Sequence, residues 1–192
     1  MSEAYEYFDD DEEEPVNPYQ FLIEPRYERI GGIVYAMGSP QYWHQRIVGK
    51  LYAQLMFQLD RYGCEVFIAP FDTYILADLG DDETFVEPDL FISCDQNKIR
   101  QLHTRKQTHY HGAPAMVIEV LSPSTRSYDL NTKRELYQQA GVREYWLVDP
   151  DEKILYTANV NLDAYKTTDL VTHPVAALRE IPGCTVDFGA IF

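Results

Sequence analysis

Residues 114–150 read PAMVIEVLSPSTRSYDLNTKRELYQQAGVREYWLVDP, and this segment predicts a strand, a helix and a second strand in succession. The first apolar run contains a single acid, Glu119, which is typical of a buried strand that carries one carboxylate. Asp129 is the predicted N-cap of a helix that Gly141 ends, and residues 144–148 form the second apolar strand. Because a helix connects the two strands, we expect a right-handed crossover and therefore parallel strands.

A helical wheel at about 100° per residue places Lys133 near the middle of the apolar face of this helix. Five further residues share that face: Asp129, Leu130, Leu136, Tyr137 and Ala140. The opposite arc is polar and consists of Asn131, Thr132, Arg134, Glu135, Gln138 and Gln139. A lysine on a buried face must either extend to solvent or meet an anion, because an unpaired buried charge is costly. Glu119, near the end of the preceding strand, is the predicted partner of Lys133.

Length and composition favour a single domain without a membrane partner. A chain of 192 residues can bury a full core, and it has no apolar run near the roughly 18 residues of a membrane span. The N-terminus lacks the basic region of an export signal, so we expect a cytoplasmic location. Cys64, Cys94 and Cys184 are odd in number and widely spaced. That pattern predicts reduced, largely buried thiols rather than a zinc cluster or a disulfide framework.

The net charge of −15 argues against a nucleic-acid partner, but the distribution of the charge weakens that objection. Residues 1–14 contain eight acids and no Lys or Arg. We expect residues 1–18 to form an acidic, disordered tail and residues 19–192 to form one domain. The tail has two possible roles: it keeps the protein soluble, or it competes with phosphates for a basic surface.

Two elements are predicted after the tail, a β-hairpin and a long helix. Gly31 and Gly32 separate two short apolar segments, which is a strong hairpin signal. Ser39 and Pro40 then supply an N-cap and a first helical position for an amphipathic helix over residues 41–62. His44 falls in the middle of its apolar face. It is either a core histidine bonded to a backbone carbonyl or a side chain that faces a functional site.

The middle of the chain alternates short strands with loops. Residues 65–76 predict one strand or two, interrupted at Pro70, and residues 78–82 form an acidic, solvated loop. Residues 84–94, TFVEPDLFISC, predict a short strand after Pro88. Asp89 lies there between apolar neighbours and is the second acid embedded in a strand.

Residues 96–118 contain no Asp or Glu, and they are the segment best suited to phosphate contacts, although a solvated connector explains them equally well. Its cations and histidines are Lys98, Arg100, Arg105, Lys106, His103, His109 and His111. No third ligand lies at motif spacing from His109 and His111, which disfavours a metal pair. Towards the C-terminus, residues 154–160 predict a hairpin partner for the preceding strand. Residues 181–192, IPGCTVDFGAIF, predict an edge strand and an apolar clasp.

Asp89, Glu119 and Lys133 form a chemically coherent set. Hydrolysis of a phosphodiester needs a divalent cation, and carboxylate oxygens are the ligands that Mg²⁺ prefers. A lysine beside them would orient the attacking water or stabilise the phosphorane. The alternative is a buried Glu119–Lys133 ion pair without catalysis.

At these residues the sequence resembles the Uma-two family, which is assigned to the PD-(D/E)XK restriction endonucleases. The resemblance covers residues 19–192 and rests on four segments together with the spacing of Asp129, Lys133 and Tyr137. These segments are GGIVYAMGSPQYWH (31–44), EPDLF (87–91), MVIEVLSPST (116–125) and GVREYWLVDP (141–150). The most specific part runs from EVLSPST to YWLVDP.

The resemblance implies an α/β fold with a restriction-endonuclease-like core, in which helices flank a central mixed β-sheet and an N-terminal hairpin precedes it. Asp89 matches the motif aspartate and Glu119 the second acid, and these two would hold the metal. The usual motif lysine lies two residues after that acid, where this chain has Leu121. In the family the lysine is displaced to the following helix, where Lys133 stands. Tyr137 would support it, and His44 matches a histidine that recurs on the first helix.

The implied function is a Mg²⁺-dependent endonuclease, for which Mn²⁺ would substitute, acting on DNA phosphodiesters. The implied catalytic residues are Asp89, Glu119, Lys133, Tyr137 and His44. A homodimer would suit the cutting of two strands, and the apolar C-terminal stretch and hairpin edges offer surface for it. Two alternatives stay open: a noncatalytic binding module that keeps the nuclease fold, and a metallohydrolase that acts on other phosphate esters.

Overall fold

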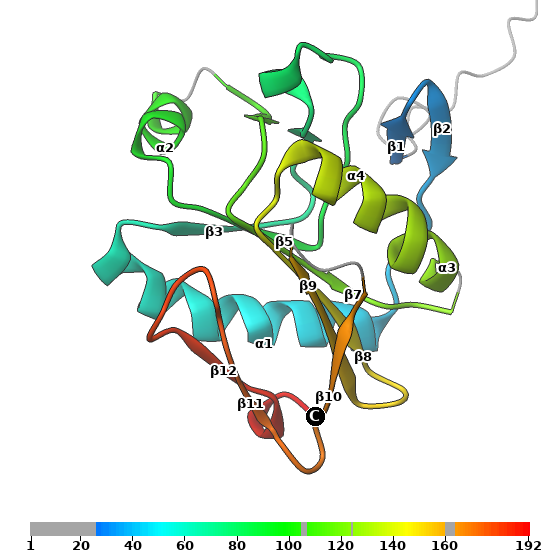
Figure 1. The fold of residues 1–192 in the computed structure, drawn as a ribbon, viewed down its shortest axis with the longest axis vertical. Helices are drawn as coiled ribbons and strands as arrows, with labels where there is room; N and C mark the ends of the chain where they lie inside the picture. Colours follow the sequence, from blue (N-terminus) through cyan, green and yellow to red (C-terminus); the bar gives the residue numbers. More distant parts are fainter. Residues whose placement is uncertain (1–25, 105–106, 124, 160–163) are drawn as a thin grey trace, which may run out of the picture.

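The computed structural model describes residues 26–104, 107–123, 125–159 and 164–192. Within these ranges, six strands form a central mixed sheet in the order β10-β9-β8-β7-β5-β3 (Figure 1). In chain order the strands are β3 (Glu65–Ile68), β5 (Leu90–Ser93), β7 (Met116–Val120), β8 (Glu144–Asp149), β9 (Ile154–Asn159) and β10 (Lys166–Asp169). Strands β7 and β8 are parallel, and every other pair of neighbours in this sheet is antiparallel. The predicted α/β class with a central mixed sheet is confirmed.

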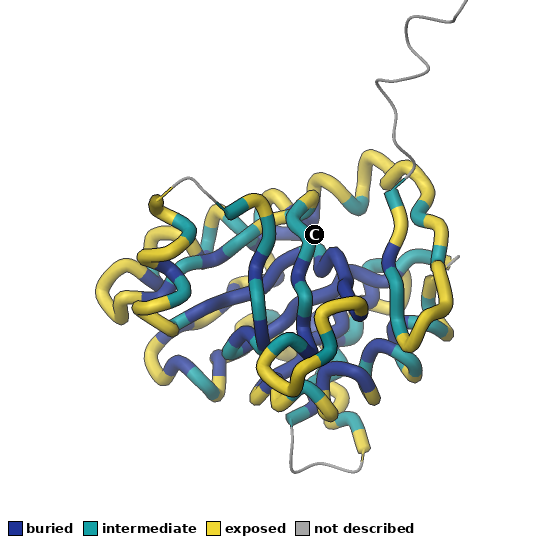
Figure 2. The backbone as a smooth tube through the Cα atoms, turned by 90° about the horizontal axis from the view of Figure 1, so that it is seen from above, coloured by how far each residue is buried: buried dark blue, intermediate teal, exposed yellow. Residues whose placement is uncertain are grey.

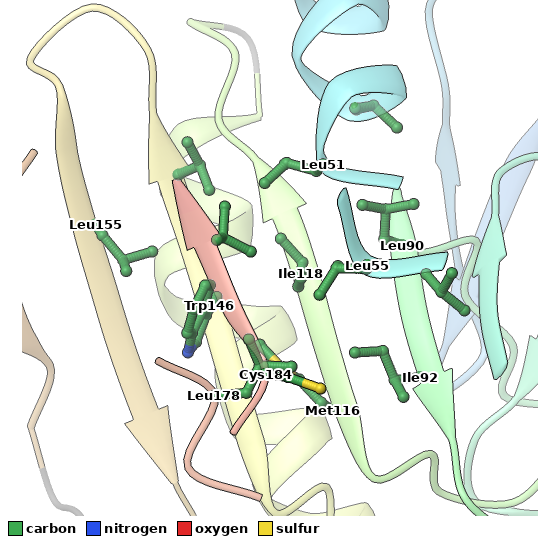
Figure 3. Packing of buried hydrophobic residues seen from close by; sticks show 14 of the residues in the cluster. Leu51, Leu55, Leu90, Ile92, Met116, Ile118, Trp146, Leu155, Leu178 and Cys184 are labelled. Carbon is green, nitrogen blue, oxygen red and sulfur yellow. The ribbon is translucent and has the colours of Figure 1, made fainter. Parts of the chain in front are cut away.

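Helices cover both faces of the sheet, and alternate residues of its strands point to one face or the other. Helix α1 (Tyr42–Leu59) lies on one face, where Leu51 and Leu55 are fully buried. It packs there against sheet residues including Leu90, Ile92, Met116, Ile118, Trp146 and Val148, several of which Figure 3 shows. The helical segment after β7 covers the opposite face through Leu136 and Tyr137. In Figure 2 the central strands are accordingly dark blue and the outer loops yellow.

The predicted hairpin is present as β1 (Tyr27–Ile30) and β2 (Ile33–Ala36), which pair in an antiparallel register. Gly31 and Gly32 join them with φ values of 56° and 81°, in a region of the Ramachandran map that favours glycine. A bridge between Arg29 and Phe85 links the hairpin to the rest of the fold. Residues 1–25, which include the predicted acidic tail, lie outside the described residues.

The long amphipathic helix is confirmed, but its start was predicted too early. Gln41 is the N-cap of α1, two residues after the predicted Ser39, and its side chain makes no capping hydrogen bond. A 3-10 turn (Asp60–Tyr62) follows the helix, and Gly63 ends it with φ 64°. The buried positions of α1 are Ile47, Val48, Leu51, Leu55 and Leu59, whereas Trp43, an apolar residue of the first turn, is exposed.

The crossover from β7 to β8 contains a correction. The helix begins with α3 (Arg126–Tyr128), continues as a π-helical turn (Asp129–Lys133) and ends as α4 (Arg134–Ala140). Asp129 is therefore not an N-cap: its N–H already donates to the carbonyl of Thr125 at 2.9 Å, inside the helix. Gly141 ends the helix with φ 87°, and β7 and β8 are parallel, both as predicted.

The prediction for the cysteines was wrong, because Cys64 and Cys94 form a disulfide bond. Cys64 directly precedes β3 and Cys94 directly follows β5, and the antiparallel register pairs Glu65 with Ser93. The two cysteines are consequently opposite each other, with Cα atoms 4.2 Å apart. Cys184 is a free, buried thiol.

Short strands follow β3, as predicted, and so does one helix that was not predicted. The chain breaks at Pro70 before β4 (Thr73–Tyr74), which pairs with β6 (Tyr110–His111). Helix α2 (Gln96–His103) occupies the start of the segment without acids. Two of its basic side chains pair with acids from elsewhere: Lys98 with Asp78 at 2.7 Å and His103 with Glu65 at 2.9 Å. Part of the predicted basic surface is thereby neutralised.

The C-terminal segment forms the expected apolar clasp against α1. Strands β11 (Val175–Ala177) and β12 (Thr185–Asp187) pair with each other rather than with the central sheet. Gln54 and Gln58 of α1 exchange hydrogen bonds with the backbone of β12 at 2.8–3.0 Å. The buried side chains of the clasp are Ile181, Cys184, Val186, Phe188 and Ile191. Within the described ranges, no helix is long and apolar enough to cross a membrane.

Candidate active site

Asp89 and Glu119 meet at one end of neighbouring antiparallel strands. Asp89 directly precedes β5, Glu119 is in β7, and Leu90 pairs with Ile118 in the register. Each carboxylate accepts a hydrogen bond from the backbone of the opposite segment. Asp89 Oδ2 accepts from the N–H of Val120, the residue after Glu119, at 2.8 Å, and Glu119 Oε2 accepts from the N–H of Asp89 at 3.1 Å. The two predicted acids therefore form one unit that the strand pairing holds in place.

Lys133 reaches this unit from the crossover helix. Its Nζ lies 2.8 Å from Glu119 Oε1, and the Tyr137 hydroxyl donates to the same oxygen at 2.7 Å. The three side chains are almost completely buried. The π-helical turn that ends at Lys133 widens the helix there, as π turns often do at functional sites. The predicted placement of Lys133 and Tyr137 beside Glu119 is confirmed.

A further carboxylate, Glu28 of β1, belongs to the same cluster, and sequence reasoning missed it. Its Oε1 lies 2.9 Å from Lys133 Nζ and also accepts from Glu87 N at 2.9 Å. Its Oε2 accepts from the Tyr128 hydroxyl at 2.9 Å, and the side chain is 1% exposed. The short strand YERI has no apolar alternation that would indicate burial of Glu28, so periodicity offered no signal.

One lysine thus faces three buried carboxylates, since Asp129 Oδ1 lies 3.8 Å from Lys133 Nζ. Burial raises the pKa of Glu119 to about 8, because Lys133 only partly offsets it and Asp89, Asp129 and Glu28 add to it. Burial likewise raises the pKa of Asp129. Burial opposes the charge of Lys133, but the carboxylates of Glu119, Glu28 and Asp129 raise its pKa well above the ordinary value. Lys133 therefore stays charged, and the cluster retains a proton near neutral pH.

His44 faces the same site from the first turns of α1. Its Nε2 lies 3.0 Å from Asp89 Oδ2 and 3.0 Å from the carbonyl oxygen of Val120. Nδ1 is buried and has no hydrogen-bond partner among the residues that the structure describes. Burial lowers the pKa of the imidazole, but the hydrogen bond to Asp89 and the charges of Asp89 and Glu119 more than offset this, so its pKa is raised. His44 combines both predicted possibilities, because it bonds a backbone carbonyl and a site carboxylate.

The oxygen atoms of the site fit a hard cation that keeps part of its water shell. His44 Nε2 lies within hydrogen-bond distance of both Asp89 Oδ2 and the Val120 carbonyl oxygen, so these two oxygens point to the same place. The Asp89 side chain is 18% exposed, and solvent can therefore reach it. In the described parts of the chain, no group of three or more His, Cys, Asp or Glu side chains is arranged to hold a metal. Mg²⁺ commonly uses only one or two carboxylates plus waters, whereas structural zinc needs a complete protein cage.

This chain is similar to known proteins over most of its length. The model of the Uma2 family, described as a putative restriction endonuclease, matches residues 17–186. An uncharacterized protein of Synechocystis sp. (strain ATCC 27184 / PCC 6803 / Kazusa) is 29% identical over 145 residues, which is 75% of this chain and 67% of that protein. A crystal structure from Anabaena variabilis ATCC 29413, described as a putative nuclease belonging to DUF820, matches with a TM-score of 0.68. That match has 18% identity, covers 93% of this chain and 98% of the other, and shows a shared fold.

Proposed function

This chain belongs to the Uma2 family of restriction-endonuclease-like proteins, and on that premise we propose that it is a Mg²⁺-dependent endonuclease that hydrolyses DNA phosphodiester bonds. One observation supports the proposal above the others. Lys133 lies 2.8 Å from Glu119, and Glu119 in turn bonds the backbone of Asp89, so groups from the crossover helix, β7 and the residue before β5 converge. Convergence of a buried lysine with two acids, one of which, Glu119, has a raised pKa, is typical of a functional site.

In this proposal, Asp89 and Glu119 would hold the cation, and Lys133 would contact the scissile phosphate. Bound there, Mg²⁺ or its substitute Mn²⁺ would offset the charge that develops on the phosphate and lower the pKa of an attacking water. Tyr137 orients Glu119 through its hydroxyl, and His44 orients Asp89 through Nε2. The ammonium of Lys133 stabilises the added negative charge of the transition state.

A second candidate, a noncatalytic module with a nuclease fold, has its own support. Both oxygens of Glu119 already accept hydrogen bonds, Oε1 from Lys133 and Tyr137 and Oε2 from Asp89 N. A closed ion pair of this kind would serve as a buried structural element that binds no metal. Metal affinity separates the two candidates.

The deciding experiment is a calorimetric titration with Mn²⁺ that compares the wild type with Glu119→Gln. The nuclease proposal expects binding that the substitution abolishes. The matched control is Glu144→Gln, because Glu144 is also a buried carboxylate in a strand, but it accepts from Trp146 Nε1 and two backbone N–H groups away from the site. Absent binding, or equal binding in both proteins, would favour the noncatalytic module.

Cleavage assays then identify the substrate class. Supercoiled plasmid, single-stranded DNA, RNA and a small phosphodiester are incubated with Mg²⁺, with Glu119→Gln and Glu144→Gln as the inactive and active controls. Cleavage of DNA alone supports the proposal, whereas cleavage of the small ester alone supports a metallohydrolase of other phosphate esters. Light scattering on the same samples tests the proposed homodimer, and a monomeric mass at micromolar concentration would contradict it.

A further inference from the structure

Glu28 joins the three segments that build the site. It is part of the N-terminal hairpin, and it accepts a hydrogen bond from the backbone N–H of Glu87, two residues before Asp89. It also accepts from the Tyr128 hydroxyl at the start of the crossover helix and contacts Lys133 in the turn that follows. Every one of these contacts is between residues far apart in the sequence.

The contact with Lys133 is as close as the one that Lys133 makes with Glu119. The two distances from Nζ are 2.9 Å and 2.8 Å. Asp129 is further away, at 3.8 Å, and the Tyr128 ring centroid lies 5.5 Å from Nζ. Without Glu28, Glu119 would be the only carboxylate within hydrogen-bond distance of the ammonium among the residues that the structure describes.

We propose that Glu28 is a positioning residue that acts through Lys133: it holds the ammonium in place when Glu119 turns to a metal ion. The inference rests on the function proposed above. Because Lys133 Nζ contacts both Glu28 and Glu119, it can lose the contact with Glu119 and still be held in position by Glu28. If Glu119 were the sole close partner, the ammonium would compete with the metal ion for Glu119 Oε1.

The main variant is Glu28→Gln. Its amide oxygen can accept from Glu87 N, and its amide NH₂ can donate to the Tyr128 oxygen, so the local hydrogen bonds are kept and the charge is removed. We expect Mn²⁺ affinity to fall about 5- to 10-fold, although Glu28 is not itself a ligand. If the wild type cleaves DNA, we expect kcat to fall about tenfold while KM stays within about twofold. The reason is that a displaced ammonium weakens the contact with the reacting phosphate in the transition state and leaves the binding of the rest of the DNA unchanged.

A double-mutant cycle with Lys133→Met tests the route of the effect. The proposal expects Glu28→Gln to change Mn²⁺ affinity by less than about twofold once Lys133 is absent. An equal loss in both backgrounds would show that Glu28 acts on the metal directly by its charge, and it would overturn the proposal. No loss in either background would overturn it as well.

Glu28→Asp covers the case in which the Lys133 variants do not fold. Aspartate keeps the charge but is shorter by one methylene, so it withdraws from Lys133. The proposal expects this variant to lose Mn²⁺ affinity as Glu28→Gln does, whereas wild-type affinity would contradict it. These variants are compared by their Mn²⁺ affinity alone. A wild type that binds Mn²⁺ but cuts no DNA would therefore defeat the nuclease proposal, while the Mn²⁺ affinities of the Glu28 variants would still test the role of Glu28. Glu144→Gln again controls for the loss of a buried carboxylate.

Discussion

Lys133 Nζ and Glu119 Oε1 form a 2.8 Å ion pair in which both side chains are about 5% exposed or less. The pair lies between the crossover helix and the middle of the sheet, so it is part of the core as well as of the site. Breaking a buried pair from one side leaves a charge without compensation. The consequences for stability and for metal binding can be measured separately.

Replacing Lys133 by Met should destabilise the protein in a pH-dependent way. At pH 9 we expect a loss of about 3–5 kcal/mol in the free energy of unfolding, because three buried carboxyls lose their cation. At pH 5 the loss should be smaller: the pKa of Glu119 is about 8, so that carboxyl is already protonated and needs no partner.

Urea unfolding at both pH values measures this difference. Lys166→Met is the control, since Lys166 is exposed on β10 and its loss should cost less than about 0.5 kcal/mol. A loss for Lys133→Met that is the same at pH 5 and pH 9 would contradict the assigned protonation of the cluster.

Metal affinity should rise with pH and level off above about pH 8. Since the folded-state pKa of Glu119 is raised to about 8, a metal must displace a proton below that pH. We expect the affinity for Mn²⁺ to increase about tenfold per pH unit between pH 6 and pH 7.5. Calorimetry at pH 7 in buffers of different ionisation enthalpy should show release of about one proton per ion. An affinity that is constant over this range would count against Glu119 as a ligand.

Tyr137→Phe should destabilise the charged form of Glu119. The hydroxyl of Tyr137 donates to Glu119 Oε1 at 2.7 Å, so its removal should raise the pKa of Glu119 further and shift the pH midpoint of Mn²⁺ binding upward. The free energy of unfolding should fall by about 1–2 kcal/mol.

Tyr145→Phe is the matched control for that change. Tyr145 is equally buried, and its hydroxyl donates to the backbone oxygen of Asp129 at 3.1 Å. A similar loss of stability without a shift of the pH midpoint is expected. If both variants shift the midpoint equally, the hydrogen bond to Glu119 is not the cause.

His44→Ala should strengthen Mn²⁺ binding and weaken cleavage. The imidazole Nε2 occupies the point between Asp89 Oδ2 and the Val120 carbonyl, so its removal frees both oxygens. We expect affinity to rise by up to about tenfold, the worth of one charge-assisted hydrogen bond. His103→Ala, at an exposed histidine that pairs with Glu65, should leave affinity unchanged. Weaker binding in His44→Ala would contradict this expectation and show that the orientation of Asp89 by His44 matters more than the oxygens that its removal frees.

The disulfide should make a measurable contribution to stability. It closes a loop with a sequence separation of 30 residues, so reduction should lower the free energy of unfolding by about 3–4 kcal/mol in the chain-entropy description. Urea unfolding with and without reductant measures the loss, and Cys184→Ser controls for the remaining thiol. Thiol titration of the denatured, unreduced protein should find one free thiol per chain, and three would refute the bond.

Much of the site could be predicted from the sequence because its central part is local. Glu119, the crossover helix and Lys133 lie within one segment, and helical geometry alone aims Lys133 at the preceding strand. The apolar runs on both sides indicate buried strands, and the helix between them makes the strands parallel. Asp89 was identifiable for a similar reason, since an acid beside an otherwise apolar strand needs a partner.

The errors have physical causes. The π-helical turn at Asp129 uses a hydrogen-bond spacing that a 3.6-residue wheel does not contain, so the helix was predicted to begin four residues late. The disulfide depends on which residue of β3 lies opposite which residue of β5. Cysteine spacing along the chain does not specify that register.

The sequence by itself therefore determined the strand–helix–strand order around the crossover, the parallel pairing of β7 and β8, and the inward direction of Lys133. Each of these follows from periodicity and chain connection over a few turns. The tertiary structure alone decided that Glu28 reaches Lys133, that His44 reaches Asp89 and that Cys64 meets Cys94. These contacts join residues far apart in the chain, and only the packing of the hairpin and α1 against the sheet determines which of them meet.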